Sequence, residues 1–160
     1  PTAAEQRLAD PQILSMLASL DAVPTDQLSP RAKRRIAELQ EPPKTALQNL
    51  KVVHEAGVTI VMGTDAGNIG TVHGPSVFRE MAMMQQAGLT PLQVLRAATI
   101  NGARAAHREP AAGKIERGAP ADLVLLDADP TVDIANASRI ARVFRNGFMF
   151  DPDQLIASIR

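Results

Sequence analysis

Cysteine is absent from this 160-residue sequence, as are tryptophan and tyrosine. Without cysteine the chain forms no disulfides and no thiolate metal sites, and its redox compartment is left open. Its 17 basic and 17 acidic side chains cancel, so no excess charge attracts nucleic acid or an acidic membrane. No apolar run is long enough to cross a bilayer, and the low aromatic content argues against a base-stacking surface. The expected partner is therefore a small-molecule substrate, with no nucleic acid and no membrane.

What is present suits a globular protein with a sizeable core, since 45% of the residues are hydrophobic and 21% are charged. A short helix is predicted over residues 30–40, where a small basic cluster fits a solvated helix face. The Pro42-Pro43 pair then breaks the chain.

Residues 45–67 form the clearest unit of the sequence. A helix beginning near Thr45 is expected to turn Leu47, Leu50 and Val53 inward, and Gly57 is expected to end it. The apolar, β-branched run that follows predicts a strand over residues 58–63, buried on both faces as in a parallel sheet. A polar loop, Gly63–Gly67, comes directly after this strand.

Two helices are expected over residues 75–105, separated at Gly88. The first should pack through Val77, Met81 and Met84. The second has a strong start signal in Thr90-Pro91, and its expected inner stripe is Leu92, Leu95 and Ala98. Strands follow over residues 121–127 and 140–145. The pair Asn146-Gly147 predicts a hairpin with a return strand over residues 148–150, which makes residues 121–150 a small antiparallel unit.

Asp65 is the first candidate for chemistry. A carboxylate just past the end of a buried parallel strand lies where α/β barrels build their active sites. There it can bind a divalent metal or accept a proton from an attacking water. The alternative is an aspartate that only caps the following turn, and position alone leaves both roles open.

His73 lies eight residues later in the same loop region, where it can contact a substrate or a metal or simply bond to the backbone. The nearby glycines lack the lysine and the spacing of a phosphate-binding loop. His54 and His107 lie on or beside helices and receive no catalytic role. Because the three histidines do not fall at metal-ligand spacings, a site with three or four protein ligands cannot be assembled from this chain alone.

Several segments, in their order and spacing, resemble the C-terminal part of the amidohydrolase superfamily, in its imidazolonepropionase-like and prolidase-like branch. The resemblance covers roughly residues 45–150. It rests on Gly57–Gly67, His73–Ser76, Glu80-Met81, Ala87–Pro91, Ala97–Thr99 with Asn101 and Ala103–Ala105, Gly113–Gly118 and Ala121–Asp127.

The resemblance implies an α/β fold: the C-terminal part of a TIM-like (β/α)8 barrel plus part of a small β-sandwich domain. Residues 1–108 would supply the last helices and strand eight of the barrel. Residues 109–160 would supply the C-terminal portion of the small composite β domain. The barrel elements earlier than these are not in this sequence, so the chain is expected to be a fragment.

In function, the resemblance implies a metal-dependent hydrolase that uses metal-activated water on C–N bonds of amides, cyclic amides or dipeptides. Asp65 would bind the metal and act as general base, and His73 would face the substrate. The expected cofactor is a divalent metal, zinc, as one or two ions in the full-length parent. Lactone or phosphotriester hydrolysis is one alternative, and a non-catalytic remnant or interaction module is another.

The sequence departs from the family pattern in its metal ligands. The His-x-His of strand one, the bridging lysine and the two histidines of the middle strands are absent. The chain alone is therefore expected to be inactive. The substrate, the oligomeric state (including homo-oligomerisation) and the cellular location are left open.

Overall fold

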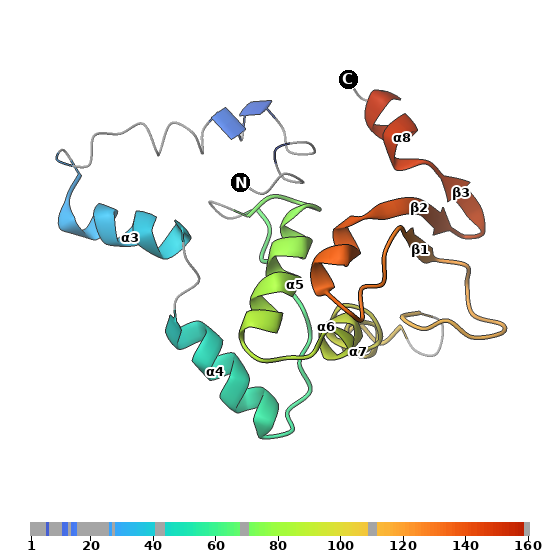
Figure 1. Cartoon of the computed structure of the whole chain (residues 1–160), viewed down its shortest axis with the longest axis horizontal. Helices are drawn as coiled ribbons and strands as arrows, with labels where there is room; N and C mark the ends of the chain where they lie inside the picture. Colours follow the sequence, from blue (N-terminus) through green and yellow to red (C-terminus); the bar gives the residue numbers. More distant parts are fainter. Residues whose placement is uncertain are drawn as a thin grey trace.

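The computed structural model describes residues 6, 11–12, 14–15, 26, 28–40, 44–67, 71–108 and 112–158. Helices α5, α6 and α7 lie at the centre, α4 and α3 lie on one side, and a three-stranded sheet with α8 lies on the other (Figure 1). Among the described residues, no helix has the length and apolar character that a membrane span requires. The elements in chain order are α3 (Pro30–Gln40), α4 (Lys44–Glu55), α5 (Ser76–Gln86), α6 (Pro91–Ala98), α7 (Ile100–Ala105), β1 (Leu123–Leu126), η2 (Ile134–Ser138), β2 (Ile140–Arg145), β3 (Phe148–Phe150) and α8 (Pro152–Ser158).

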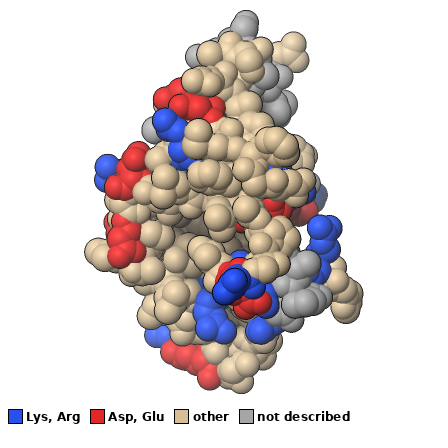
Figure 2. Space-filling view, turned by 90° about the vertical axis from the view of Figure 1, so that its right-hand side faces the viewer, with Lys and Arg blue, Asp and Glu red and all other residues tan. Residues whose placement is uncertain are grey.

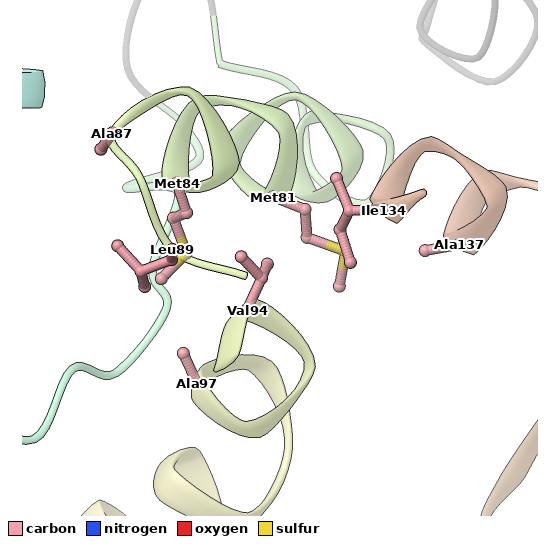
Figure 3. Close-up of a cluster of buried hydrophobic side chains, with 8 residues drawn as sticks. All are labelled: Met81, Met84, Ala87, Leu89, Val94, Ala97, Ile134 and Ala137. Atoms are coloured by element: carbon pink, nitrogen blue, oxygen red, sulfur yellow. The ribbon is translucent and has the colours of Figure 1, made fainter. Parts of the chain in front are cut away.

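The main core lies where α5, α6 and η2 meet (Figure 3). Met84 and Val94 are its most buried large side chains, 1% and 0% exposed. The turn between α5 and α6 contributes to it as well, and the 3-10 helix η2 closes it from the side of the sheet. The eight buried residues are Met81, Met84, Ala87, Leu89, Val94, Ala97, Ile134 and Ala137. One core therefore joins the helices to the segment that leads into the sheet.

Helix α4 ends as its sequence predicts. Gly57 adopts a left-handed conformation with φ +79°, and the N–H of Val58 donates to the carbonyl of Val53 at 3.3 Å, which is a common helix C-cap. Leu47 and Leu50 pack against the core. The prediction for Val53 was wrong, because this side chain is 40% exposed.

The start of α6 is confirmed in detail. Thr90 and Gln93 form a reciprocal capping box, and Pro91 follows at the first helical position. The helix is shorter than expected, because it breaks at Thr99 before α7 begins. Thr99 has φ −125° and ψ −91°, which are not helical values. The buried pair on α6 is Val94 and Ala97, so the predicted inward position of Leu92 was wrong: its side chain is 57% exposed.

Residues 58–63 do not form the strand that the apolar run predicts. None of them has strand pairing, and Val58 and Val61 are 54% and 44% exposed. Ile60 and Met62 pack against the core from one side. The segment thus has one covered and one open side, because among the described residues no strand lies beside it. Burial on both faces needs neighbouring strands, which a local apolar pattern cannot supply.

The antiparallel β unit is confirmed, with the strand order β1-β2-β3. Asn146 and Gly147 have φ values of +50° and +80°, as the tight hairpin requires. The carboxylate of Asp122 accepts the N–H of Asn146 at 2.7 Å and pairs with Arg145. On the face seen in Figure 2, basic and acidic side chains lie interspersed and neither sign covers the surface.

These elements establish an α/β fold class. The helical core and the β unit share Ile134 and Ala137 in one cluster. The division of the chain at residue 108 stays a prediction.

Candidate functional site

Asp65 lies at the end of the segment that runs from residue 58 toward the loop. It is exposed and adopts a left-handed backbone conformation with φ +50°, which aspartate tolerates better than most residues. The hydroxyl of Thr71 donates to the main-chain oxygen of Asp65 at 3.1 Å. The backbone at Asp65 is therefore held from across the loop.

His73, the second candidate residue, lies next to Gly67 of this loop. The N–H of Gly67 donates to the main-chain oxygen of Thr71 at 3.2 Å, and the φ of Gly67 is +105°. A methyl group added at Gly67 would lie 3.5 Å from Nε2 of His73. Asp65 and His73 therefore belong to one folded-back loop, with the imidazole of His73 directly beside Gly67.

The far side of this loop is anchored in the interior. Ser76, at the start of α5, is 2% exposed, and its Oγ accepts the N–H of Val72 at 2.7 Å. Val72 is itself buried. His73 and Gly74, which lie between these two residues in sequence, are exposed, and Gly74 has φ +85°. The buried Ser76 contact thus fixes a turn that presents His73 to solvent.

The segment before Asp65 is fastened to the helices that follow it in sequence. Nδ2 of Asn101 donates to the carbonyl of Ile60 at 2.8 Å. The N–H of Met62 donates to the carbonyl of Ala97 at 3.1 Å. Two hydrogen bonds from α6 and α7 therefore set the path that ends at Asp65.

Three further titratable residues lie outside this loop in sequence. His54 is in the last turn of α4, and His107 follows α7 as an exposed residue with φ +52°. On α5, burial raises the pKa of the Glu80 carboxyl, and the Arg79 guanidinium partly opposes this shift. The sequence reasoning had given neither Glu80 nor Thr71 a part in the site. The Thr71 contact joins residues six positions apart, and no local sequence pattern signals it.

The described residues do not complete a metal site. They contain no group of three or more histidine, cysteine, aspartate or glutamate side chains that could hold an ion. Asp65 offers one carboxylate and His73 one imidazole near the same loop. This donor set is too small for the tetrahedral or five-coordinate sites of hydrolytic metals.

The fold and this loop define an α/β protein with a carboxylate presented at the end of a core-packed segment. The sequence model of the Amidohydrolase family matches residues 16–149, and the chain belongs to that family.

Relatives within the family include hydrolytic enzymes, and each is much longer than this chain. The chain is 29% identical to ochratoxinase of Aspergillus niger over 122 residues, which cover 74% of this chain and 25% of that enzyme. It is 42% identical to imidazolonepropionase of Treponema denticola over 86 residues, which cover 52% of this chain and 20% of that enzyme. The chain thus spans about a quarter of the length of ochratoxinase.

A solved relative supports the fold. The crystal structure of a prolidase in complex with N-methylphosphonate-L-proline superimposes with a TM-score of 0.60 and 26% identity, over 78% of this chain and 30% of that protein. The imidazolonepropionase and prolidase likenesses confirm the branch of the family that the sequence resembles.

Proposed function

We propose that this chain forms the C-terminal part of a hydrolase that acts on C–N bonds of amides, cyclic amides or dipeptides. The single observation that carries the proposal is the placement of Asp65, a carboxylate-bearing residue whose backbone is held at the end of a core-packed segment, in a chain of the amidohydrolase family. The likeness to imidazolonepropionase and to a prolidase supports C–N bonds as the target.

The proposed architecture is the last wall of a (β/α)8 barrel followed by part of a small β domain. In the complete protein, residues 58–63 would be strand eight. The face with Ile60 and Met62 would keep its contacts with the core, the face with Val61 would turn toward the barrel interior, and the unpaired backbone edges would meet neighbouring strands. Asp65 would then face the barrel mouth, where such folds carry their catalytic groups.

In this role, the Asp65 carboxylate accepts a proton from the attacking water. The water oxygen forms a bond to the carbonyl carbon, and the C–N bond then breaks. Asp65 returns the proton to the leaving nitrogen, so the carboxylate is regenerated. His73, on the same loop, would contact the substrate and help to orient its carbonyl group.

A divalent metal, with zinc the expected ion, is part of the proposal as one or two ions in the complete enzyme. Asp65 would contribute one ligand. Because the described residues hold too few ligands, the other ligands would have to come from outside them.

The experiment is a hydrolysis assay of the full-length parent, supplied with zinc, on matched panels of dipeptides, cyclic amides, lactones and phosphotriesters. Turnover highest on the dipeptides or cyclic amides supports the proposal. Higher turnover on lactones or on phosphotriesters would instead identify that substrate class as the target of the enzyme. No turnover on any panel would favour a non-catalytic remnant or interaction module. The 160-residue chain alone is the control, and it should show no activity.

A further inference from the structure

A cavity of about 230 Å³ lies beside the beginning of the segment that ends at Asp65. The described residues that line the cavity include none from the loop that carries Asp65 and His73, so the cavity is distinct from that loop. Its polar lining comes from α4, the segment after it, α6 and α7, and consists of His54, Thr59, Gln93, Arg96, Asn101 and Arg104.

The lining combines cationic groups with neutral donors. Arg96 and Arg104 both line the cavity, with His54 at the end of α4, and none of the described lining residues is acidic. A guanidinium offers a planar fork of N–H donors that matches the oxygens of a phosphate. Two such forks at one cavity suit a ligand group that carries about two negative charges at neutral pH.

Gln93 has its amide orientation fixed by the capping box. Its Oε1 accepts the N–H of Thr90 at 2.8 Å, so its Nε2 amide is the end left to donate. Asn101 is fixed in a similar way by its hydrogen bond to Ile60. These restraints reduce the ordering that a ligand would have to impose on the lining.

The floor of the cavity is part of the core. Leu89 and Ala97 line it, and both also belong to the buried cluster of Figure 3, where they are 3% and 1% exposed. A cavity backed by such packed residues is preformed. Its volume lies below the range of ~300–1,000 Å³ that is usual for drug-sized ligands, so it suits a small ligand.

We propose that this cavity binds a phosphate group, either as free inorganic phosphate or as the phosphoryl group of a small metabolite. Arg96 and Arg104 contact the phosphate oxygens, and Gln93 donates from its amide. This binding does not depend on the hydrolase proposal, because none of these residues belongs to the Asp65 loop.

The test is equilibrium dialysis of the full chain against radiolabelled inorganic phosphate at constant ionic strength. This readout counts bound ligand per chain whether or not the chain self-associates. We expect saturable binding with one site per chain. Arg96→Ala and Arg104→Ala should each weaken it about tenfold or more, because each removes charged hydrogen bonds. Arg117→Ala is the matched control, since Arg117 is exposed and lies outside the cavity, and it should leave binding unchanged.

Competition identifies the source of the phosphate. Displacement by glycerol 3-phosphate at lower concentrations than by unlabelled phosphate indicates a phosphorylated metabolite, and the reverse order indicates free phosphate. Arg96→Lys keeps the charge but loses the fork, and it should bind with intermediate affinity even if the alanine variants fold poorly. Absence of saturable binding, or an equal loss in Arg117→Ala, would overturn the proposal.

Discussion

The side-chain amide of Asn101 donates a hydrogen bond to the main-chain oxygen of Ile60 at 2.8 Å, across 41 positions of sequence. This bond ties the start of the Asp65 segment to α7. The position of Asp65 therefore depends on α7, a helix that follows it in the sequence.

Asn101→Ala removes this tie and leaves the Ile60 carbonyl without its side-chain donor. The amide is half-buried, so we expect a loss of about 1–3 kcal/mol in the free energy of unfolding, measured by urea titration. Asn136→Ala is the control: Nδ2 of Asn136 bonds to the carbonyl of Asp129 at 2.9 Å, but locally and in solvent. Equal losses in the two variants would show that the long-range bond has no special weight.

Gly113 lies against the break between α6 and α7. A methyl group there would be 2.8 Å from Cα of Ile100 and 2.9 Å from the carbonyl oxygen of Thr99, and φ is +81°. Both contacts are with backbone, which cannot move aside easily. We therefore expect Gly113→Ala to lower the free energy of unfolding by about 2–4 kcal/mol, from overpacking together with backbone strain.

The control for this change is Gly118→Ala. Gly118 has φ +91°, but a methyl group there would meet nothing within 4 Å. It should show the backbone strain alone, about 1 kcal/mol. If both glycine variants lost the same stability, the close approach at Gly113 would carry no energetic cost.

Asp65→Asn, made in the full-length parent, keeps the size of the side chain but removes the proposed base. We expect turnover to fall by at least ~10²–10⁴-fold with substrate affinity much less affected, as read from kcat and KM in a zinc-supplemented assay. Asp127→Asn, at an exposed position after β1, should leave kcat unchanged. Turnover close to that of the parent in Asp65→Asn would assign Asp65 to capping its turn.

Glu80 should make stability depend on pH in a defined direction. Burial raises its pKa above the ordinary 4.5, so the folded state binds the proton more tightly than the unfolded state. The free energy of unfolding should therefore fall as the pH rises from about 4.5 through the folded pKa, and then level off. Glu80→Gln should flatten this dependence in urea titrations repeated across that range.

Arg79→Gln provides the opposite perturbation. Arg79 lowers the pKa of Glu80, so its removal should raise that pKa further and extend the decline to higher pH. A pH dependence that is the same in all three proteins would mean that Glu80 does not titrate differently on folding.

The open side of residues 58–63 should make the chain associate with itself. Val58 and Val61 are 54% and 44% exposed beside a backbone without strand partners, a combination that favours edge-to-edge pairing. We expect light scattering to find oligomers, and the double variant Val58→Thr, Val61→Thr to reduce them. Val132→Thr, at a position 77% exposed in a turn, should not. A monomer that unfolds cooperatively would contradict this expectation.

The helix ends and the hairpin were the parts of the fold that could be predicted from sequence. Gly57, the Thr90 capping box and the Asn146-Gly147 hairpin were placed correctly, because each depends on residues within one or two turns of chain. The break at Thr99 was missed, since no glycine or proline marks it in the sequence. The inward side of α6 was wrong because it depends on which elements pack against the helix: Val94, and not Leu92, belongs to the cluster shared with α5.

In the candidate site, too, the order of residues along the chain could be predicted, but their contacts could not. The sequence predicted that Asp65 follows an apolar segment and that His73 shares its loop region. It could not predict that Gly67 lies against His73 or that Thr71 holds the backbone of Asp65, because those contacts depend on how the loop folds back. Strand pairing over residues 58–63 failed as a local prediction, because it requires partners distant in sequence. The catalytic roles of Asp65 and His73 stay predictions.

The buried cluster of Figure 3 has a consequence for the order of folding. Six of its eight members lie between Met81 and Ala97, so the part of the cluster formed by α5 and α6 closes over short stretches of chain at a small entropic cost. The amides of α5 and α6 should then exchange with deuterium most slowly, whereas those of residues 58–65, held by few hydrogen bonds, should exchange early. The helical core would thus be a folding unit in its own right, and the Asp65 segment would dock onto a surface that has already formed.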